Sequence, residues 1–199
     1  MLAAGGSARL GRPKQLEEVR GERLLERAVR VAAEAGFDPV VAVLGAAAKR
    51  ISEECDLRRS WVVVNPGWAE GMGSSVRAGV ELVESFREVT GAVLMTCDMP
   101  AVTAEHLRAL ADAGEEVVAS KYAERRGVPA YFARGRFAEL RELRGDVGAR
   151  ELLRGAKVVE LPGGEVDVDT AEDLARARER FEGYGFLSLF LGRSAVRKS

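Results

Sequence analysis

Glycines and basic side chains near the start of the sequence are its clearest candidate for binding chemistry. Gly5, Gly6 and Ser7 are followed at short spacing by Arg9 and Lys14. Glycines leave backbone N–H groups unobstructed and allow positive φ, while Arg and Lys side chains add charge-assisted hydrogen bonds to phosphate oxygens. This combination predicts a loop that cradles a polyphosphate at the end of a strand.

Two common phosphate-binding motifs do not account for this loop. A P-loop ends in Gly-Lys-Ser/Thr, whereas Arg12 and Pro13 separate Gly11 from Lys14 here. The dinucleotide fingerprint G-x-G-x-x-G is approached only by residues 71–76, which lack the third glycine. A plain surface turn would need only one or two glycines. The sequence therefore favours a phosphate loop of a different type.

Carboxylates follow two segments that are predicted to be strands. Asp98 comes directly after the apolar run Ala92–Cys97, and Asp167 and Asp169 alternate with valines before the last predicted helix. Ligand sites of open α/β sheets lie at the carboxyl ends of the strands, and Mg²⁺ usually takes one or two carboxylates from the protein. We therefore expect Asp98 to bind Mg²⁺, the alternative being a cap for the helix after Pro100. The second segment offers a further carboxylate.

A third candidate segment joins a glycine-punctuated loop to a helix start. Residues 65–79 run from a strand end through Gly71 and Gly73 to Ser74 and Ser75. A helix N-terminus presents free N–H groups and partial positive charge to a ligand. The serines are therefore candidate polar contacts, and the alternative is that they cap the helix.

These segments resemble a known family. The run Leu2–Leu16 closely resembles the opening motif of the MobA-like nucleotidyltransferases related to molybdenum-cofactor cytidylyltransferase. The resemblance implies that the loop wraps the triphosphate of the incoming nucleotide and that Arg9, Lys14 and Asp98 are catalytic. It implies further that residues 65–79 contact the base and ribose. The nucleotide-binding residues expected on this basis are Leu2, Ala3, Ala4, Gly5, Gly6, Ser7, Lys14, Gly73, Ser74, Ser75 and Asp98.

The family's Asp-x-Asp-Thr segment corresponds to residues 167–170 and implies a second acidic ligand for the metal. We prefer Asp167, because Asp169 lies closer to the helix start, where a cap or a ribose contact would explain it. Asp98, Asp167 and Asp169 are the candidate metal ligands, and the order of the last two stays open.

The acceptor side is represented by Gly145–Arg150, which matches the family's Gly-Asp-x-Gly-Ala-Arg stretch. By this resemblance Asp146 and Arg150 orient a phosphate-bearing acceptor, although a helix start capped by the aspartate explains much of the same pattern. Val128 stands where the family commonly has histidine.

The resemblance implies transfer of CMP from CTP to molybdopterin, with Mg²⁺ as cofactor, giving molybdopterin cytosine dinucleotide and pyrophosphate. The expected partners are a nucleoside triphosphate, with CTP favoured, and a phosphate-bearing small molecule. A molybdoenzyme or its chaperone is a further candidate. The alternatives are a GTP-dependent or sugar- or polyol-phosphate nucleotidyltransferase of the same fold, and a nucleotide-binding regulator without turnover. Val128 and the short first strand leave the regulator open, whereas Asp98 and Asp167 argue against it.

Short β-branched runs alternate with segments of helical period, which predicts an α/β fold. By resemblance this is a three-layer αβα sandwich with a Rossmann-like, mostly parallel sheet of the nucleotide-diphospho-sugar transferase type. The last helix is expected to begin at Thr170, with Asp173 completing the cap. The first strand is either very short or begins upstream of Met1. The other predicted strands are Val40–Leu44, Trp61–Asn65, Ala92–Cys97, Val117–Ser120, Ala130–Ala133, Val158–Leu161 and Val166–Val168.

Composition narrows the remaining possibilities. The 30 basic and 31 acidic residues nearly cancel, which argues against nucleic acid or an anionic membrane as partner. Two cysteines without metal-ligand spacing favour a reducing compartment, and no apolar run approaches the length of a membrane helix, so we expect a cytoplasmic protein. We predict one nucleotidyltransferase domain, residues 1–181, and a C-terminal tail, residues 182–199, of unknown role. The tail's apolar part, 183–191, is a candidate subunit contact.

Overall fold

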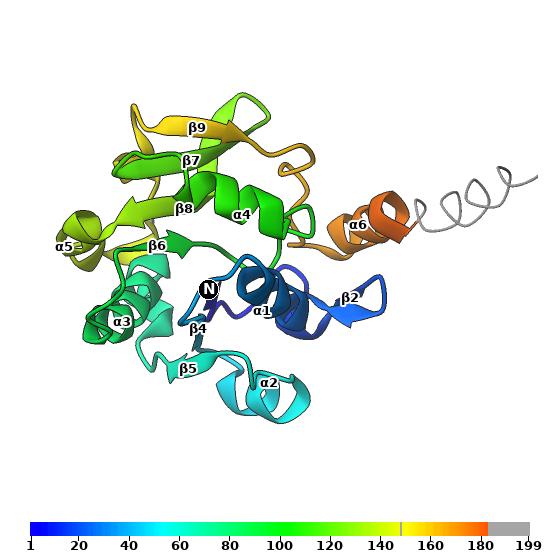
Figure 1. Cartoon of the computed structure of the whole chain (residues 1–199). Helices are drawn as coiled ribbons and strands as arrows, with labels where there is room; N and C mark the ends of the chain where they lie inside the picture. Colours follow the sequence, from blue (N-terminus) through cyan, green and yellow to red (C-terminus); the bar gives the residue numbers. More distant parts are fainter. Residues whose placement is uncertain (148, 183–199) are drawn as a thin grey trace, which may run out of the picture.

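The parallel part of the sheet comes from the first half of the chain. The structure, a computed structural model, describes residues 1–147 and 149–182 (Figure 1). β4 lies between β1 and β5 in parallel, and a bridge between Leu2 and Thr96 joins β1 to the segment after β6. β6 and β7 both pair antiparallel with β8, and β9 pairs parallel with β7. These strands are β1 (Leu2–Ala3), β4 (Val41–Leu44), β5 (Trp61–Val64), β6 (Gly91–Leu94), β7 (Val117–Tyr122), β8 (Arg125–Ala133) and β9 (Lys157–Glu160).

Helices cover both faces of this sheet. Alternate residues of β4 enter different core clusters: Val41 and Val43 pack with α3 and α5, whereas Leu44 packs with α1 and α4. Figure 1 shows α1 beside α4, and α6 beside β2 (Glu18–Val19). The chain therefore has the predicted α/β fold with three layers. The helices are α1 (Leu24–Glu34), α2 (Ala48–Glu54), α3 (Met72–Ser85), α4 (Ala104–Ala111), α5 (Phe137–Arg141) and α6 (Ala171–Glu182).

The predicted start of α6 is confirmed by a reciprocal cap. The backbone N–H of Asp173 donates to Thr170 Oγ1 at 3.1 Å, and the N–H of Thr170 donates to Asp173 Oδ2 at 2.9 Å. This is the capping-box arrangement, in which two otherwise unpaired donors are satisfied. The cap fixes the place where the acidic segment before α6 ends.

One predicted strand is wrong. Residues 166–168 join no sheet, because a single hydrogen bond, from the N–H of Val168 to the carbonyl oxygen of Asp98 at 3.0 Å, links them to the chain after β6. Val168 is buried against α6 rather than between strands. The hairpin formed by β2 (Glu18–Val19) and β3 (Glu22–Arg23) was not predicted. Its two-residue strands are too short to show an alternation of polar and apolar residues.

Further expectations concern membrane helices, the two cysteines and the C-terminal tail. None of the helices in the described ranges is long and apolar enough to cross a membrane. Cys55 and Cys97 are both buried free thiols. The predicted subunit contact at 183–191 lies outside the described residues, and the division into a domain and a tail stays a prediction.

Candidate active site

The site lies where the chain changes direction across the sheet. From β1 the chain passes to β4 and β5 on one side, and it then returns to β6 on the other side of β1. A crevice forms at such a switch point, outside the carboxyl ends of the strands. The glycine-rich loop leaves the end of β1, and Asp98 follows β6, so the two predicted segments meet at this crevice.

A cavity of about 330 Å³ opens there. Its wall is shared by the loop after β1, the start of α3, the segment after β6 and the segment before residue 147. The predicted site residues that line it are Leu2, Ala3, Ala4, Gly5, Gly6, Lys14, Ser75, Asp98 and Asp146. Those outside its lining are Ser7, Arg9, Gly73, Ser74, Arg150, Asp167 and Asp169.

Two polar side chains hold the glycine-rich loop in shape. The backbone N–H of Lys14 donates to Ser7 Oγ at 3.1 Å, and Ser7 itself has a φ of 51°. Gln15 is buried, and its Nε2 donates to the carbonyl oxygens of Ala3 at 2.7 Å and Gly5 at 3.2 Å. The Ser7 hydroxyl therefore organises the loop. Gln15, which sequence reasoning did not single out, supports the loop from the protein side.

The ammonium of Lys14 joins two carboxylates that are far apart in the sequence. Its Nζ lies 2.6 Å from Asp98 Oδ2 and 2.8 Å from Asp169 Oδ1, and all three side chains are largely buried. Burial by itself would lower the pKa of Lys14, but the charges of Asp98 and Asp169 and their hydrogen bonds outweigh it and raise the pKa. Lys14 is therefore charged at neutral pH, and the carboxylates share its charge.

The helix-cap explanations for both aspartates are wrong. Thr103 caps α4, accepting from the N–H of His106 at 3.2 Å, so Asp98 is free for another role. Asp173 caps α6, and the side chain of Asp169 instead binds Lys14 and, at 2.6 Å, the mostly exposed Arg9. Asp169 is thus closer to Asp98 and Lys14 than the sequence argument assumed.

Asp167 lies nearby without a partner of opposite charge. It makes no ion pair within residues 1–147 and 149–182, and its pKa is raised by burial and then by repulsion from Asp169 and Asp98. Three carboxylates therefore concentrate negative charge at one end of the site, and Lys14 neutralises only part of it.

This arrangement suits a hard divalent cation. Among the described residues, no group of three or more His, Cys, Asp or Glu side chains is close enough to form a complete protein cage. Mg²⁺ rarely uses such a cage, because it keeps waters and takes phosphate oxygens beside one or two carboxylates. Asp98 and Asp169 already share one cation, the Lys14 ammonium, which supports two carboxylate ligands at this position. Asp167 stays a predicted ligand.

Replacing Asp167 with asparagine should stabilise the metal-free protein. The pKa of Asp167 is higher in the folded protein than in the unfolded chain, so its charged form is less favourable after folding. At neutral pH, where the carboxylate is charged, Asp167 therefore lowers the free energy of unfolding. We expect a higher Tm for Asp167→Asn at pH 7 with a chelator, a gain that shrinks as the pH is lowered. With Mn²⁺ added, the natural protein should gain more in Tm than the variant.

The control for this experiment is Asp112→Asn, which changes an exposed aspartate at the end of α4. A Tm that falls in Asp167→Asn under chelation would contradict the repulsion. Equal stabilisation of both proteins by Mn²⁺ would remove Asp167 from the metal site.

The two serines at the start of α3 have different roles. The N-cap of α3 is Gly71, so neither serine caps the helix, and that alternative is wrong. Ser74 Oγ accepts from Asn65 Nδ2 at 2.8 Å and lies 2.8 Å from the carbonyl oxygen of Gly71, so its hydrogen-bonding capacity is used inside the protein. Ser75 Oγ accepts from Asn65 at 3.1 Å, lines the cavity and keeps its proton for a ligand.

Glycines bring the α3 start against the predicted acceptor segment. A Cβ on Gly73 would lie 2.9 Å from the backbone nitrogen of Arg144, and a Cβ on Gly71 would lie 2.5 Å from the carbonyl carbon of Gly145. Gly73 is therefore a packing residue. The contact places Asp146 in the cavity wall, whereas Arg150, at the start of a 3-10 helix (Arg150–Leu153), lies outside it.

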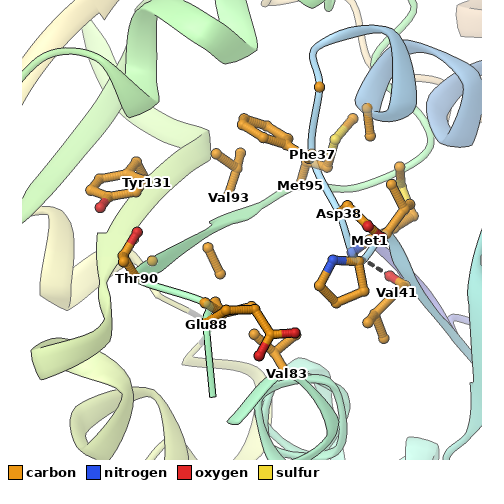
Figure 2. A pocket seen from close by; sticks show the side chains of 17 residues that line it. Met1, Phe37, Asp38, Val41, Val83, Glu88, Thr90, Val93, Met95 and Tyr131 are labelled. Atoms are coloured by element: carbon orange, nitrogen blue, oxygen red, sulfur yellow. Dashed lines mark hydrogen bonds between the residues drawn. The ribbon is translucent and has the colours of Figure 1, made fainter. Parts of the chain in front are cut away.

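A second cavity, of about 250 Å³, lies at the opposite end of the sheet (Figure 2). It fills the gap between the beginnings of β4 and β6, where the two-residue β1 does not reach. The Met1 nitrogen donates across this gap to the carbonyl oxygen of Val41 at 2.9 Å. Its lining is mainly apolar and has no Lys or Arg side chain. It therefore offers a polyphosphate no basic side chain, unlike the cavity at the switch point, which Lys14 lines.

Fold and site together define a nucleotidyltransferase-type α/β protein. Residues 1–161 match the MobA-like NTP transferase domain, and the chain belongs to this family. A nicotine blue oxidoreductase of Paenarthrobacter nicotinovorans is 34% identical over 191 residues, or 88% of this chain and 93% of that protein. A probable molybdenum cofactor guanylyltransferase of Opitutus terrae is 36% identical over 107 residues, 52% of this chain and 48% of that one.

The same relationship appears among solved structures. The crystal structure of Rv0371c from Mycobacterium tuberculosis is 35% identical, with a TM-score of 0.78 over 89% of this chain and 95% of that one. The structure of Rv0371c in complex with manganese is 33% identical, with a TM-score of 0.74 and the same coverage. The observed fold is therefore that of a structurally characterised group of proteins, one member of which binds a divalent metal.

Proposed function

We propose that the protein transfers CMP from CTP to molybdopterin in a reaction that depends on a divalent metal, with Mg²⁺ favoured. The observation that carries the proposal is the Lys14 ammonium held between Asp98 and Asp169 in the wall beside the glycine-rich loop. This places positive charge for a triphosphate next to carboxylates for a metal. The name of the Opitutus terrae relative supports a molybdenum cofactor as acceptor.

In the proposed reaction an oxygen of the acceptor phosphate attacks the α-phosphorus of CTP. The bond from this phosphorus to the bridging oxygen breaks, and pyrophosphate leaves with the bond's electron pair. The attacking phosphate is already ionised, so no general base is required. Backbone N–H groups at Gly5 and Gly6, with Lys14 and Arg9, offset the charge of the departing pyrophosphate. A divalent cation held by Asp98 and Asp169, or Asp167, would neutralise and orient the reacting phosphates.

Two further contacts come from other lining residues of the cavity. The Ser75 hydroxyl, free to donate, is the proposed polar contact to base or ribose. Asp146 is the proposed contact to the acceptor, because it lines the cavity beside Gly71. Arg150 lies outside the lining, so it could contact only a substrate that extends beyond the cavity, as we expect of a pterin acceptor. A molybdoenzyme or its chaperone is the proposed recipient of the product.

The proposal is tested by pyrophosphate release from purified protein with CTP, GTP, ATP or UTP, with Mg²⁺ or Mn²⁺, and with molybdopterin. We expect the highest kcat/KM with CTP and a product whose mass equals molybdopterin plus CMP. A preference for GTP would overturn the base assignment. Release only with a sugar or polyol phosphate would overturn the acceptor.

No release with any nucleotide would favour the regulator, provided that the nucleotide still binds. Turnover of nicotine blue, the compound in the name of the Paenarthrobacter relative, is a parallel assay, and such turnover without transfer from any nucleotide would overturn the proposal.

A further inference from the structure

Trp68 is an exposed aromatic residue in the wall of the nucleotide cavity. It lies in a 3-10 helix (Trp68–Glu70) between β5 and α3, and 37% of its surface is accessible. Tryptophan is large and apolar, so exposure next to a cavity is typical of a binding surface. The ring pair found in the described part of the chain joins Trp61 to Phe86 instead. Within residues 1–147 and 149–182, no aromatic ring pairs with that of Trp68.

Two glycines shape the seat of this side chain. A Cβ on Gly45 would lie 2.6 Å from the Cβ of Trp68, and a Cβ on Gly6 would lie 3.4 Å from Cζ3 and 3.5 Å from Cη2 of its ring. Any side chain at Gly45 would therefore displace Trp68, whereas a Cβ at Gly6 would meet the indole edge at ordinary van der Waals distance. The ring thus lies with one edge beside Gly6 of the phosphate loop.

The residues that line the cavity are of two kinds, charged and apolar. Lys14 and Asp98 supply charge, whereas Trp68, Ala69 and the 43% exposed Met72 supply apolar surface. A nucleoside triphosphate has the same division, with a charged phosphate chain and a planar ring. Bases stack on aromatic side chains through their π faces, which every base has.

We propose that Trp68 is the stacking surface for the base of the nucleotide. The inference rests on the proposed function, because it assigns one end of the same substrate. Trp68 positions the base and contributes affinity without choosing between bases, so the choice between CTP and GTP falls to polar groups such as Ser75. Because the Trp68 ring lies beside Gly6, a base stacked on it would be next to the glycine-rich loop. The triphosphate could then extend along this loop towards Lys14.

Kinetics separate this role from simple packing. Trp68→Ala should raise KM for CTP and for GTP by the same factor, about 10- to 100-fold, while kcat changes less than about twofold. Trp68→Phe, which keeps a ring, should restore KM to within a few-fold of the natural value. Unchanged KM in Trp68→Ala would overturn the proposal, and so would a factor that differs strongly between CTP and GTP.

Fluorescence tests the contact directly, because the chain has two tryptophans. In Trp61→Phe, whose remaining indole is Trp68, CTP without acceptor should quench the emission. Tripolyphosphate, which has no ring, should not. In Trp68→Phe, whose remaining indole is Trp61 on β5, CTP should cause no quenching. Equal quenching in both variants, or quenching by tripolyphosphate, would overturn the stacking contact.

Calorimetry separates failure of this inference from failure of the proposed function. If the natural protein binds no nucleotide, the proposed function itself fails. If it binds CTP and Trp68→Ala binds it equally well, only the assignment of Trp68 fails. Thermal unfolding of each variant shows whether it is folded, and Trp68→Phe gives a result even if Trp68→Ala does not fold.

Discussion

Replacing Asp98 with asparagine is expected to lower the rate of pyrophosphate release by at least about a hundredfold. Asparagine has nearly the same shape, so the loop after β6 should keep its path. The substitution removes the one negative charge that is in contact with Lys14 and also lines the cavity. Both the neutralisation of Lys14 and one proposed metal ligand are lost. The metal concentration needed for half-maximal rate should rise as well.

The matched control is again Asp112→Asn, whose rate should stay within about twofold of the natural rate. Mn²⁺ binding measured by calorimetry should weaken in Asp98→Asn but not in the control. A variant that keeps both its rate and its Mn²⁺ affinity would show that Asp98 only anchors Lys14. In that case the metal assignment would have to move to Asp167 and Asp169.

Adding one methyl group at Gly45 is expected to be the most destabilising small change in the phosphate loop region. The new Cβ would lie 2.5 Å from the carbonyl oxygen of Ala4 and 2.6 Å from the Cβ of Trp68. The first of these atoms belongs to the backbone of the loop, which must therefore move. Overpacking of this kind destabilises by about 3 kcal/mol, which corresponds to a fall in Tm of roughly 6–12 °C for a chain of this size.

Gly135→Ala is the control for this prediction, since a Cβ at that position meets no atom within 4 Å. Its Tm should stay within a few degrees of the natural value. If Gly45→Ala were as stable as Gly135→Ala, the close approach of Gly45, Ala4 and Trp68 would be wrong. In a folded Gly45→Ala protein, CTP affinity should fall as well, because the displaced atoms belong to the loop and to Trp68.

Much of the fold could be predicted because its signals are local. The helical period of Leu24, Ala28 and Val31 and the buried run at Val41–Leu44 each depend on neighbours within a few residues. The Thr170 cap is also local. The segment at 166–168 was predicted as a strand because its alternation is the same, but a strand needs a partner. Among the described residues, its backbone partners are Gly163, within the preceding turn, and Asp98, about seventy residues earlier, and neither belongs to a strand.

The site was less predictable because its geometry depends on long-range contacts. Sequence reasoning named Lys14, Asp98 and Asp169 separately, but nothing local indicates that one ammonium joins residues separated by 84 and 155 positions. For the same reason the sequence favours Asp167 over Asp169 as the second metal ligand, since Asp169 lies closer to the helix start. The sequence favours Gly73 as a ligand-binding glycine, but its neighbour Arg144 is brought to it by the packing of the start of α3 on the segment after α5.

The short β1 leaves the two parts of the sheet joined by few backbone hydrogen bonds. Among the described residues, Leu2 makes this link, through its N–H bond to the carbonyl oxygen of Met95 at 2.8 Å and its bridge to Thr96. Side chains of both halves pack together in the two large core clusters, and the cavity of Figure 2 lies at one end of the junction. Lys14 and Asp98 belong to opposite halves, so their ion pair adds a polar link at the other end. A substrate that contacts both side chains would therefore bridge the two halves of the sheet.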